Sequence, residues 1–228
     1  MLIDLQFNPA FDDWATLRGS VQRAEAEGFD TVWVFDHFDG AMLRGPRPVL
    51  ECFTLLGALA AATTTIGIGS MVVNVANRHP AVAAAAAASV QRMSGGRFRM
   101  GIGAGSAPGS RWAKEHDDMG IPLLPLVADR HAAVAEQIRR LREVEPMQVI
   151  VGVNSSALAQ IAGRIADGVN VRLSHPRAAQ FLDAARDAAG DRPFECSGWA
   201  FLHDWEARER ADELGIDRLV LTHAGPSA

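Results

Sequence analysis

Asp36 and His37 are the residues of this chain whose types and position best suit chemistry. They end the stretch Thr31-Val-Trp-Val-Phe-Asp-His37, in which four apolar residues run directly into an acid and an imidazole. A histidine with an ordinary pKa of about 6.5 exchanges a proton at cellular pH, and an adjacent carboxylate can orient or bind a polar ring. The alternative is an acid that caps the next helix, with a surface histidine beside it.

Other chemistry has less support in the sequence. His203 and His223 follow apolar runs, but neither has a nucleophile or a second metal ligand at a suitable spacing, and HxH, HExxH and GxSxG motifs are absent. Cys52 and Cys196 belong to no CxxC or Cys/His cluster. We therefore expect no metal site and no hydrolase triad.

Strand-like and helix-like segments alternate along the whole chain. Eight segments read as strands: 2–7, 31–35, 65–73, 98–103, 148–153, 168–173, 194–201 and 218–222. Helical spacing of apolar residues occurs between them, for example in 14–27, 51–62, 80–93 and 129–144. Eight β/α units in 228 residues favour an α/β fold, the (β/α)8 TIM barrel, over the alternative of a doubly wound sheet.

The barrel fold gives Asp36 and His37 a defined place. The run Val32 to Phe35 has no polar alternation, as expected of a parallel strand that is covered on both faces. Functional residues of such barrels lie at the carboxyl ends of the strands, where the loops converge on one mouth. The pair is therefore predicted at that mouth.

Glycines interrupt the third and fourth predicted strands. The third carries Gly67, Gly69 and Ser70 where branched side chains are usual, so we expect a bulge or a close approach to a planar ring, with irregular backbone at Ser70-Met71. The fourth ends in the sequence GIGAGS, which lacks the full spacing and context of a dinucleotide fingerprint. We expect its residues Gly103, Ala104 and Gly105 to clear space at the mouth.

The fifth predicted strand leads into a possible phosphate site. Gly152, Val153, Asn154 and Ser155 precede the helix predicted over 158–166. Backbone N–H groups and hydroxyls at a helix start can hold a phosphate. The alternative is an ordinary Ser or Asn N-cap.

Composition bounds the partners. Hydrophobic residues make up 48% of the chain, charged residues 21%, and the net charge is -5, which gives no electrostatic reason to expect nucleic acid or an anionic membrane. The first residues do not resemble a signal peptide, and no run reaches about 18 apolar residues. We expect one domain, residues 1–228, in a cytoplasmic protein that acts on a small molecule.

Several stretches resemble the luciferase-like monooxygenases and their deazaflavin-dependent relatives. These are VWVFDHF at 32–38, residues 64–80 with Arg78-His79-Pro80, and SGGRFRMGIGAG at 94–105. A weaker likeness joins 151–153 to IAGRIADG at 161–168. The resemblance spans the chain, and the SGGRF block is its most specific part.

The resemblance implies a cofactor in the barrel mouth, either FMN or the deazaflavin coenzyme F420. The ring would lie against Ser70, Met71 and Val72, where the family often has a non-prolyl cis peptide, which maps to Ser70-Met71. The phosphate would lie at residues 152–155.

The resemblance favours coenzyme F420, because deazaflavin-dependent members of the family commonly end the second strand with an Asp-His pair. In this interpretation Asp36 and His37 contact or polarise the ring, a hydride moves to or from a small organic substrate without oxygen, and His37 carries the proton. One alternative is an FMN-dependent monooxygenase that uses oxygen and a partner reductase. Another is a flavin-binding protein without turnover.

The chain also differs from the family pattern. It lacks the usual insertion before the fifth strand, and Ser106 and Ala107 stand where some sugar-phosphate dehydrogenases of the family use a glutamate, so that activity is not expected. The resemblance further implies a homodimer through the helices that follow strands two and three.

Overall fold

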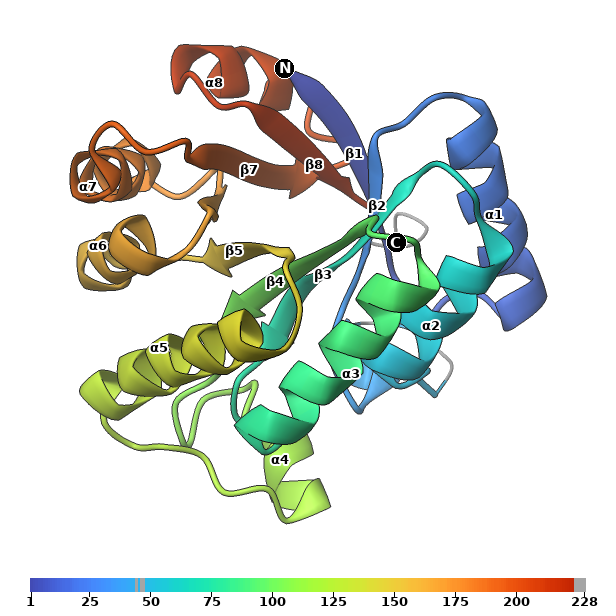
Figure 1. Cartoon of the computed structure of the whole chain (residues 1–228), viewed down its shortest axis with the longest axis horizontal. Helices are drawn as coiled ribbons and strands as arrows, with labels where there is room; N and C mark the ends of the chain where they lie inside the picture. The colour runs from blue at the N-terminus through green and yellow to red at the C-terminus, as the bar shows by residue number, and fades with distance from the viewer. Residues whose placement is uncertain (44, 46–47, 224–228) are drawn as a thin grey trace.

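The computed structural model of this protein describes residues 1–43, 45 and 48–223 and consists of a closed parallel barrel surrounded by helices (Figure 1). Each strand pairs with the next along the chain, and the last pairs with the first. The strands are β1 (Leu2–Phe7), β2 (Thr31–Val34), β3 (Gly67–Asn74), β4 (Phe98–Gly103), β5 (Gln148–Gly152), β6 (Gly168–Arg172), β7 (Glu195–Phe201) and β8 (Arg218–Thr222). The predicted (β/α)8 barrel is confirmed, and the doubly wound sheet is excluded.

Helices cover the outside of the barrel. They are α1 (Trp14–Ala26), the 3-10 turn η1 (Gly40–Leu43), α2 (Cys52–Ala62), α3 (Pro80–Met93), α4 (Lys114–Met119), α5 (Val127–Val144), α6 (Ser156–Ile165), α7 (Ala178–Ala189) and α8 (Ala207–Glu213). Their starts follow from local chemistry: the Asp13 carboxylate accepts from the Thr16 amide, and Pro80 opens α3 where no amide donor is needed. Only residues 145–147 join α5 to β5, as expected without an insertion.

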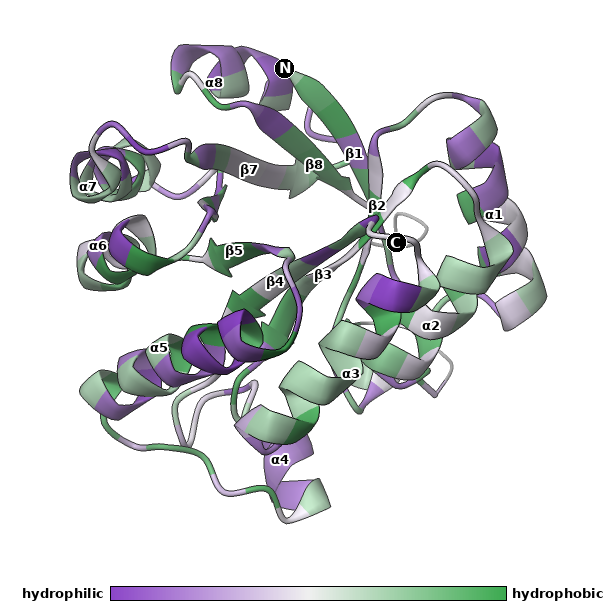
Figure 2. Cartoon of the chain, viewed as in Figure 1, coloured by the Kyte–Doolittle hydropathy of each residue, from purple (hydrophilic) through white to green (hydrophobic). Residues whose placement is uncertain are grey.

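The apolar side chains form two layers. The larger core fills the space between strands and helices, and Figure 2 shows hydrophobic residues along the strands and polar residues on the outer helix faces. A smaller cluster inside the barrel contains Trp33, Met71, Ile150 and Val220, with Val72 and Trp199 packed against it. The barrel interior is thus filled by side chains and is not a channel.

A buried ion pair closes the amino-terminal end of the barrel. The Arg218 guanidinium donates to both oxygens of the Asp4 carboxylate at 2.7 and 2.8 Å, and the Trp33 indole donates to Asp4 at 2.7 Å. Burial raises the pKa of Asp4 despite the lowering effect of Arg218. These contacts join β1, β2 and β8, and they lie at the end of the barrel that stabilises the fold and does not build the active site.

The third strand carries the predicted irregularity, one residue later than expected. The β3–β4 register shifts between Ser70 and Val73, and the cis peptide bond joins Met71 to Val72, so the placement at Ser70-Met71 was wrong. Ser70 remains in the ladder because its hydroxyl donates to the Gly101 carbonyl at 2.8 Å and accepts from the Gly101 amide at 3.1 Å. The departure therefore begins only after Ser70.

Among the described residues, none of the helices has the length and apolar character needed to cross a bilayer.

Candidate active site at the barrel mouth

The loop after β2 carries Asp36 and His37, which have different surroundings. Strand β2 ends at Val34, one residue earlier than predicted, so Phe35 to His37 all lie beyond it. The Asp36 side chain is 1% exposed, whereas the His37 side chain is 23% exposed. Of the two, His37 alone is accessible from solvent.

Asp36 is held entirely by groups of the protein. The Arg78 guanidinium donates to its two oxygens at 2.8 Å each, and the Asn74 amide and the Asn77 side chain donate to Oδ2 at 3.1 and 2.9 Å. Arg78 also forms an ion pair with Glu51. Burial acts to lower the pKa of Arg78, but the hydrogen bonds to Asp36 and Glu51 outweigh burial and raise this pKa. The geometry makes Asp36 an anchor between β2 and β3, and its predicted contact with a cofactor stays a prediction.

His37 is paired with a buried carboxylate from α4. Its Nδ1 atom lies 2.7 Å from Oε1 of Glu115, whose side chain is 2% exposed. Oε2 of Glu115 accepts from the amides of Phe38 at 2.8 Å and Asp39 at 3.3 Å. The ring of Trp112 lies 5.8 Å from that of His37, so aromatic surface covers part of the imidazole.

Glu115 was not predicted as a site residue. The sequence showed only that no glutamate directly follows the fourth strand. Glu115 lies farther along the same connection, 78 residues from His37. A one-turn helix in a polar segment carries no periodicity that would mark one acid as buried, so no signal in the sequence identified it.

A second buried residue of α4, His116, contacts two asparagines at and after the end of β3. His116 is fully buried, and its Nε2 lies 3.0 Å from Nδ2 of Asn74 and 2.8 Å from Oδ1 of Asn77, while its Nδ1 has no partner among the described atoms. Gly105 has φ +70, and a Cβ there would clash with the Asn74 side chain. Helix α4 is therefore joined to the end of β3, and Gly105 lets the chain after β4 pass close to the Asn74 side chain.

The glycines of β4 and β5 accommodate the bulge of β3. A Cβ on Gly103 would lie 2.7 Å from Val72 Cγ2, and one on Gly152 would lie 3.0 Å from Val72 Cγ1. At Gly103 the missing side chain makes room for the side chain of Val72. Contact of a cofactor with the backbone of Gly103, Ala104, Gly105 or Gly152 stays a prediction.

The predicted phosphate loop forms the start of α6. The Ser155 hydroxyl accepts from the Leu158 amide at 3.3 Å, which is the N-cap of the alternative interpretation. The Val153 amide donates to Asn170 O at 2.9 Å, and Asn154 is exposed. The adjacent Ser156 hydroxyl is buried and has no partner within the described part of the chain.

Aromatic side chains lie on β7 and directly after it, in the part of the barrel next to β8. Trp199 contacts Phe201 edge-on at 5.5 Å, and the ring of His203 stacks on Phe201 at 5.6 Å. Arg172 lies over the Trp199 ring at 5.3 Å.

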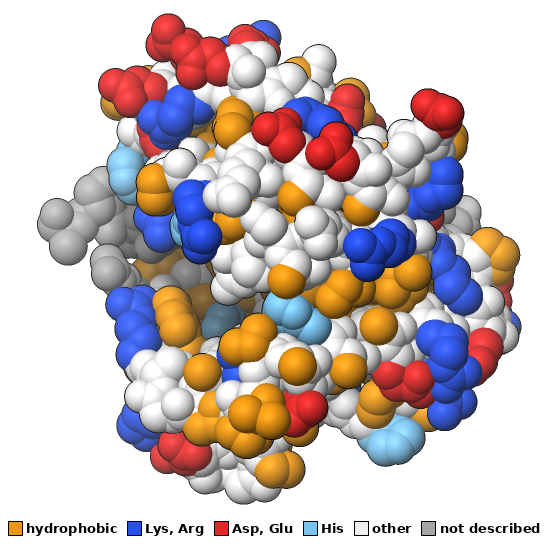
Figure 3. Space-filling view, turned by 90° about the vertical axis from the view of Figure 1, so that its left-hand side faces the viewer, with side chains coloured by type: hydrophobic (Ala, Val, Ile, Leu, Met, Phe, Trp, Pro, Cys, Tyr) orange, Lys and Arg blue, Asp and Glu red, His pale blue; other side chains and the backbone are white. Residues whose placement is uncertain are grey.

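Figure 3 shows hydrophobic and histidine side chains around a hollow on the left of the view. No group of three His, Cys, Asp or Glu side chains that could bind a metal ion occurs in the described ranges.

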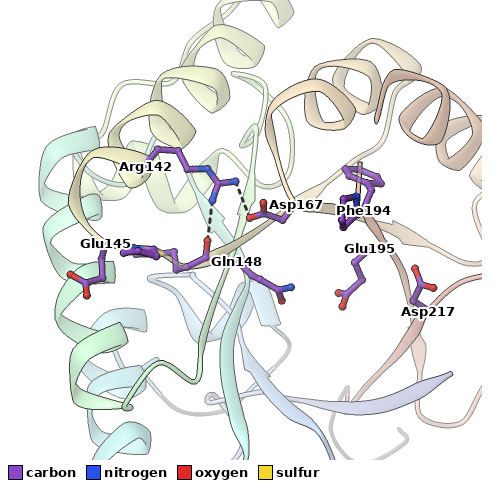
Figure 4. Close-up of a pocket in the computed structure, with 10 residues that line it drawn as sticks. Arg142, Glu145, Gln148, Asp167, Phe194, Glu195 and Asp217 are labelled. Carbon is purple, nitrogen blue, oxygen red and sulfur yellow. Dashed lines mark hydrogen bonds and ion pairs between the residues drawn. The ribbon is translucent and has the colours of Figure 1, made fainter. Parts of the chain in front are cut away.

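A depression at the opposite end of the barrel is a poorer candidate (Figure 4). Its acids are already engaged: Asp167 binds Arg142 at 2.8 Å, Glu195 binds Arg99 at 2.8 Å, and Asp217 accepts from the Cys196 amide at 2.8 Å. It surrounds the amino ends of β5 to β8, where loops of these barrels do not build active sites.

Comparisons with known proteins identify the family of the chain. The family model described as luciferase-like monooxygenase matches residues 4–144. A 5,10-methylenetetrahydromethanopterin reductase of Archaeoglobus fulgidus is 28% identical over 200 residues, which are 75% of this chain and 54% of that protein. An F420-dependent glucose-6-phosphate dehydrogenase of Amycolatopsis mediterranei is 28% identical over 178 residues, 64% of this chain and 50% of that protein. The chain thus spans about half the length of these two relatives.

Solved structures share the fold at lower identity. An F420-dependent secondary alcohol dehydrogenase in complex with an F420-acetone adduct has a TM-score of 0.79 at 18% identity, covering 99% of this chain and 94% of that one. A monooxygenase from Streptomyces bottropensis has a TM-score of 0.69 at 20% identity, covering 94% and 75%. Because the family model covers more than half of its residues, this protein belongs to the luciferase-like monooxygenase family.

Proposed function

We propose that this protein is an oxidoreductase that uses coenzyme F420 to transfer a hydride to or from a small organic substrate at the barrel mouth. The observation that carries the proposal is His37, which lies at the mouth, partly exposed, and is held by the buried carboxylate of Glu115. The relative described as an F420-dependent glucose-6-phosphate dehydrogenase supports the deazaflavin. The relatives differ in substrate, so the substrate of this chain stays open.

The residues at the mouth suit such a cofactor. The β3–β4 register shifts between Ser70 and Val73, and Val72 is only partly buried there, which offers a surface for a planar ring. The Ser156 hydroxyl, buried without a partner in the described chain, is free to donate to a phosphate at the start of α6. Residues 70–72 and 152–156 would therefore hold the ring and the phosphate.

The chain supplies proton handling and positioning. A bound deazaflavin supplies the carbon that accepts or donates the hydride. When a substrate is oxidised, the hydride and a proton leave it, and His37 takes the proton; in the reverse direction His37 returns it. Asp36 and Arg78 hold the loop that carries His37, and Trp112 limits water beside the imidazole.

Two other functions use the same scaffold. An FMN-dependent monooxygenase, which needs oxygen and a partner reductase, is supported by the monooxygenase among the structural neighbours. A flavin-binding protein without turnover is supported by the short connection before β5. Titration of the purified protein with F420 and with FMN, followed by fluorescence, separates these readings. Tight FMN binding without F420 binding would reject our proposal, and F420 binding without hydride transfer to any substrate would favour the third reading.

The assembly belongs to the proposal as well. Helices α2 and α3 present small and apolar side chains to solvent, including Val82 at 58% and Met93 at 57% exposure. Covering this face in a homodimer would remove that apolar surface from water. Light scattering coupled to chromatography should give twice the monomer mass, and Val82→Arg should reduce it; a monomeric wild-type chain would reject the dimer.

A further inference from the structure

We propose that Glu115 is a positioning residue that keeps the neutral His37 ring protonated on Nδ1, so that Nε2 is left as the proton acceptor. The inference deepens the proposed function, since it assigns a proton site to the residue on which that function rests. Its basis is the 2.7 Å contact between His37 Nδ1 and Glu115 Oε1. An ionised carboxylate only accepts hydrogen bonds, so a hydrogen must lie on Nδ1.

The backbone keeps Glu115 in its ionised form. Its second oxygen accepts from two amides, those of Phe38 and Asp39, and an amide N–H cannot accept in return. Burial acts to raise the pKa of Glu115, but the bonds from His37 and from both amides outweigh it and hold the pKa below its ordinary value. The carboxylate is therefore the species that His37 meets at neutral pH.

The position of the carboxylate is fixed by its neighbour in α4. His116 is fully buried between Asn74 and Asn77, which places the short helix against the end of β3. Gly120 ends the helix with φ +66, the left-handed conformation of a C-cap. Glu115 thus approaches His37 from a helix that is anchored at its centre and its end.

The contact with Glu115 decides which nitrogen of the His37 ring can accept a proton. With Nδ1 occupied by Glu115, Nε2 is the ring nitrogen that has no hydrogen-bond partner among the described residues, and it can take a proton from a substrate. The imidazolium that forms keeps its hydrogen bond to Glu115 and gains a charge pair at 2.7 Å. This is the role that a buried acid plays when it holds a histidine in one tautomer.

Nuclear magnetic resonance of the cofactor-free protein tests the tautomer directly. With 15N-labelled histidine, long-range 1H–15N correlations at pH 8 distinguish a ring protonated on Nδ1 from one protonated on Nε2. We expect the Nδ1 form for His37, and His37→Gln identifies its signals by removing them. A wild-type His37 protonated on Nε2 would overturn the proposal whether or not F420 binds.

Glu115→Gln provides the decisive variant. The amides of Phe38 and Asp39 need an acceptor, so the glutamine oxygen should face them and its NH2 group should face His37. That NH2 donates to Nδ1, and the tautomer should switch to Nε2–H. If the amide spectrum of the variant shows a folded protein and the His37 signals are unchanged, the proposed role of Glu115 in setting the tautomer is contradicted.

A matched control and a kinetic measurement complete the design. Asp117→Asn removes an exposed acid from the same helix and should leave the His37 signals unchanged. If F420-dependent turnover is found, Glu115→Gln should lower kcat at least tenfold while the Kd for F420 changes less than threefold. Equal losses in both would indicate a structural role for Glu115.

Discussion

Arg78 holds both carboxylate oxygens of Asp36 at 2.8 Å, and the two side chains are 12% and 1% exposed. The pair fixes the loop after β2 to the segment after β3. It therefore sets where His37 can lie without taking part in proton transfer itself.

The first prediction concerns this pair. Arg78→Met should lower the free energy of unfolding by about 3 kcal/mol, because it leaves the buried Asp36 carboxylate without its cation. Urea denaturation measures the loss. The double variant with Asp36→Asn should be less destabilised than the sum of the two single changes, whereas strict additivity would show that the two residues do not interact.

The second prediction separates chemistry from binding at His37. His37→Ala should lower turnover about 100-fold or more, the scale of a lost general acid or base, with the Kd for F420 within about threefold of the wild type. Stopped-flow reduction of F420 and fluorescence titration give the two values. His203→Ala, another histidine beyond a strand end, serves as the control and should retain most of the turnover. Equal effects on turnover and binding at His37 would make it a structural residue.

The third prediction tests the start of α6. Ser156→Ala should weaken F420 binding about tenfold, since a hydrogen bond to a charged group contributes about 1.5 kcal/mol or more. A deazaflavin without the phosphate should bind both proteins equally. Ser155→Ala should instead lower stability by about 1 kcal/mol through the lost N-cap. If Ser156→Ala binds F420 with unchanged affinity, the proposal that this loop binds the phosphate is rejected.

The fourth prediction concerns acid stability at the amino end of the barrel. Burial raises the pKa of Glu25, but the amides of Thr65, Ile66 and Thr64 outweigh it and lower the pKa to about 2. A depressed folded-state pKa stabilises the protein above the unfolded value of 4.5, and the contribution disappears as the pH falls toward 2. Glu25 is partly exposed to solvent, so the screened contribution is only about 1 kcal/mol.

Glu25→Gln should therefore lower stability at pH 7 and match the wild type near pH 2. Denaturation curves across that range provide the measurement. The exposed Glu27→Gln is the control and should follow the wild type throughout. A difference that stays constant with pH would mean that the charge of Glu25 is not involved.

The sequence predicted the barrel well where burial alone decides structure. The bounds of β1, β4 and β8 match the predicted ranges because apolar runs begin and end there. β3 begins at Gly67, two residues late, and the preceding Thr64 to Ile66 amides instead bind the Glu25 carboxylate. That contact joins α1 to the chain about 40 residues later, and no local pattern reports it.

The site was predicted in part for the same reason. Strand counting placed Asp36 and His37 at the mouth, because a position at a strand end is a local property. Their partners Arg78 and Glu115 depend on how distant loops meet, and so does the Val72 side chain that fills the space beside Gly103. A pattern of residue types contains no information on these pairings.

The ion pair between Asp4 and Arg218 joins residues 214 positions apart. It forms only when β8 is available, so during synthesis β1 keeps one unpaired edge until residues 218–222 have emerged. Such an edge can recruit another strand, and long-range closure of this kind is slow. We expect the yield of active protein to depend on how quickly β8 reaches β1, with chaperones protecting that edge in the interval.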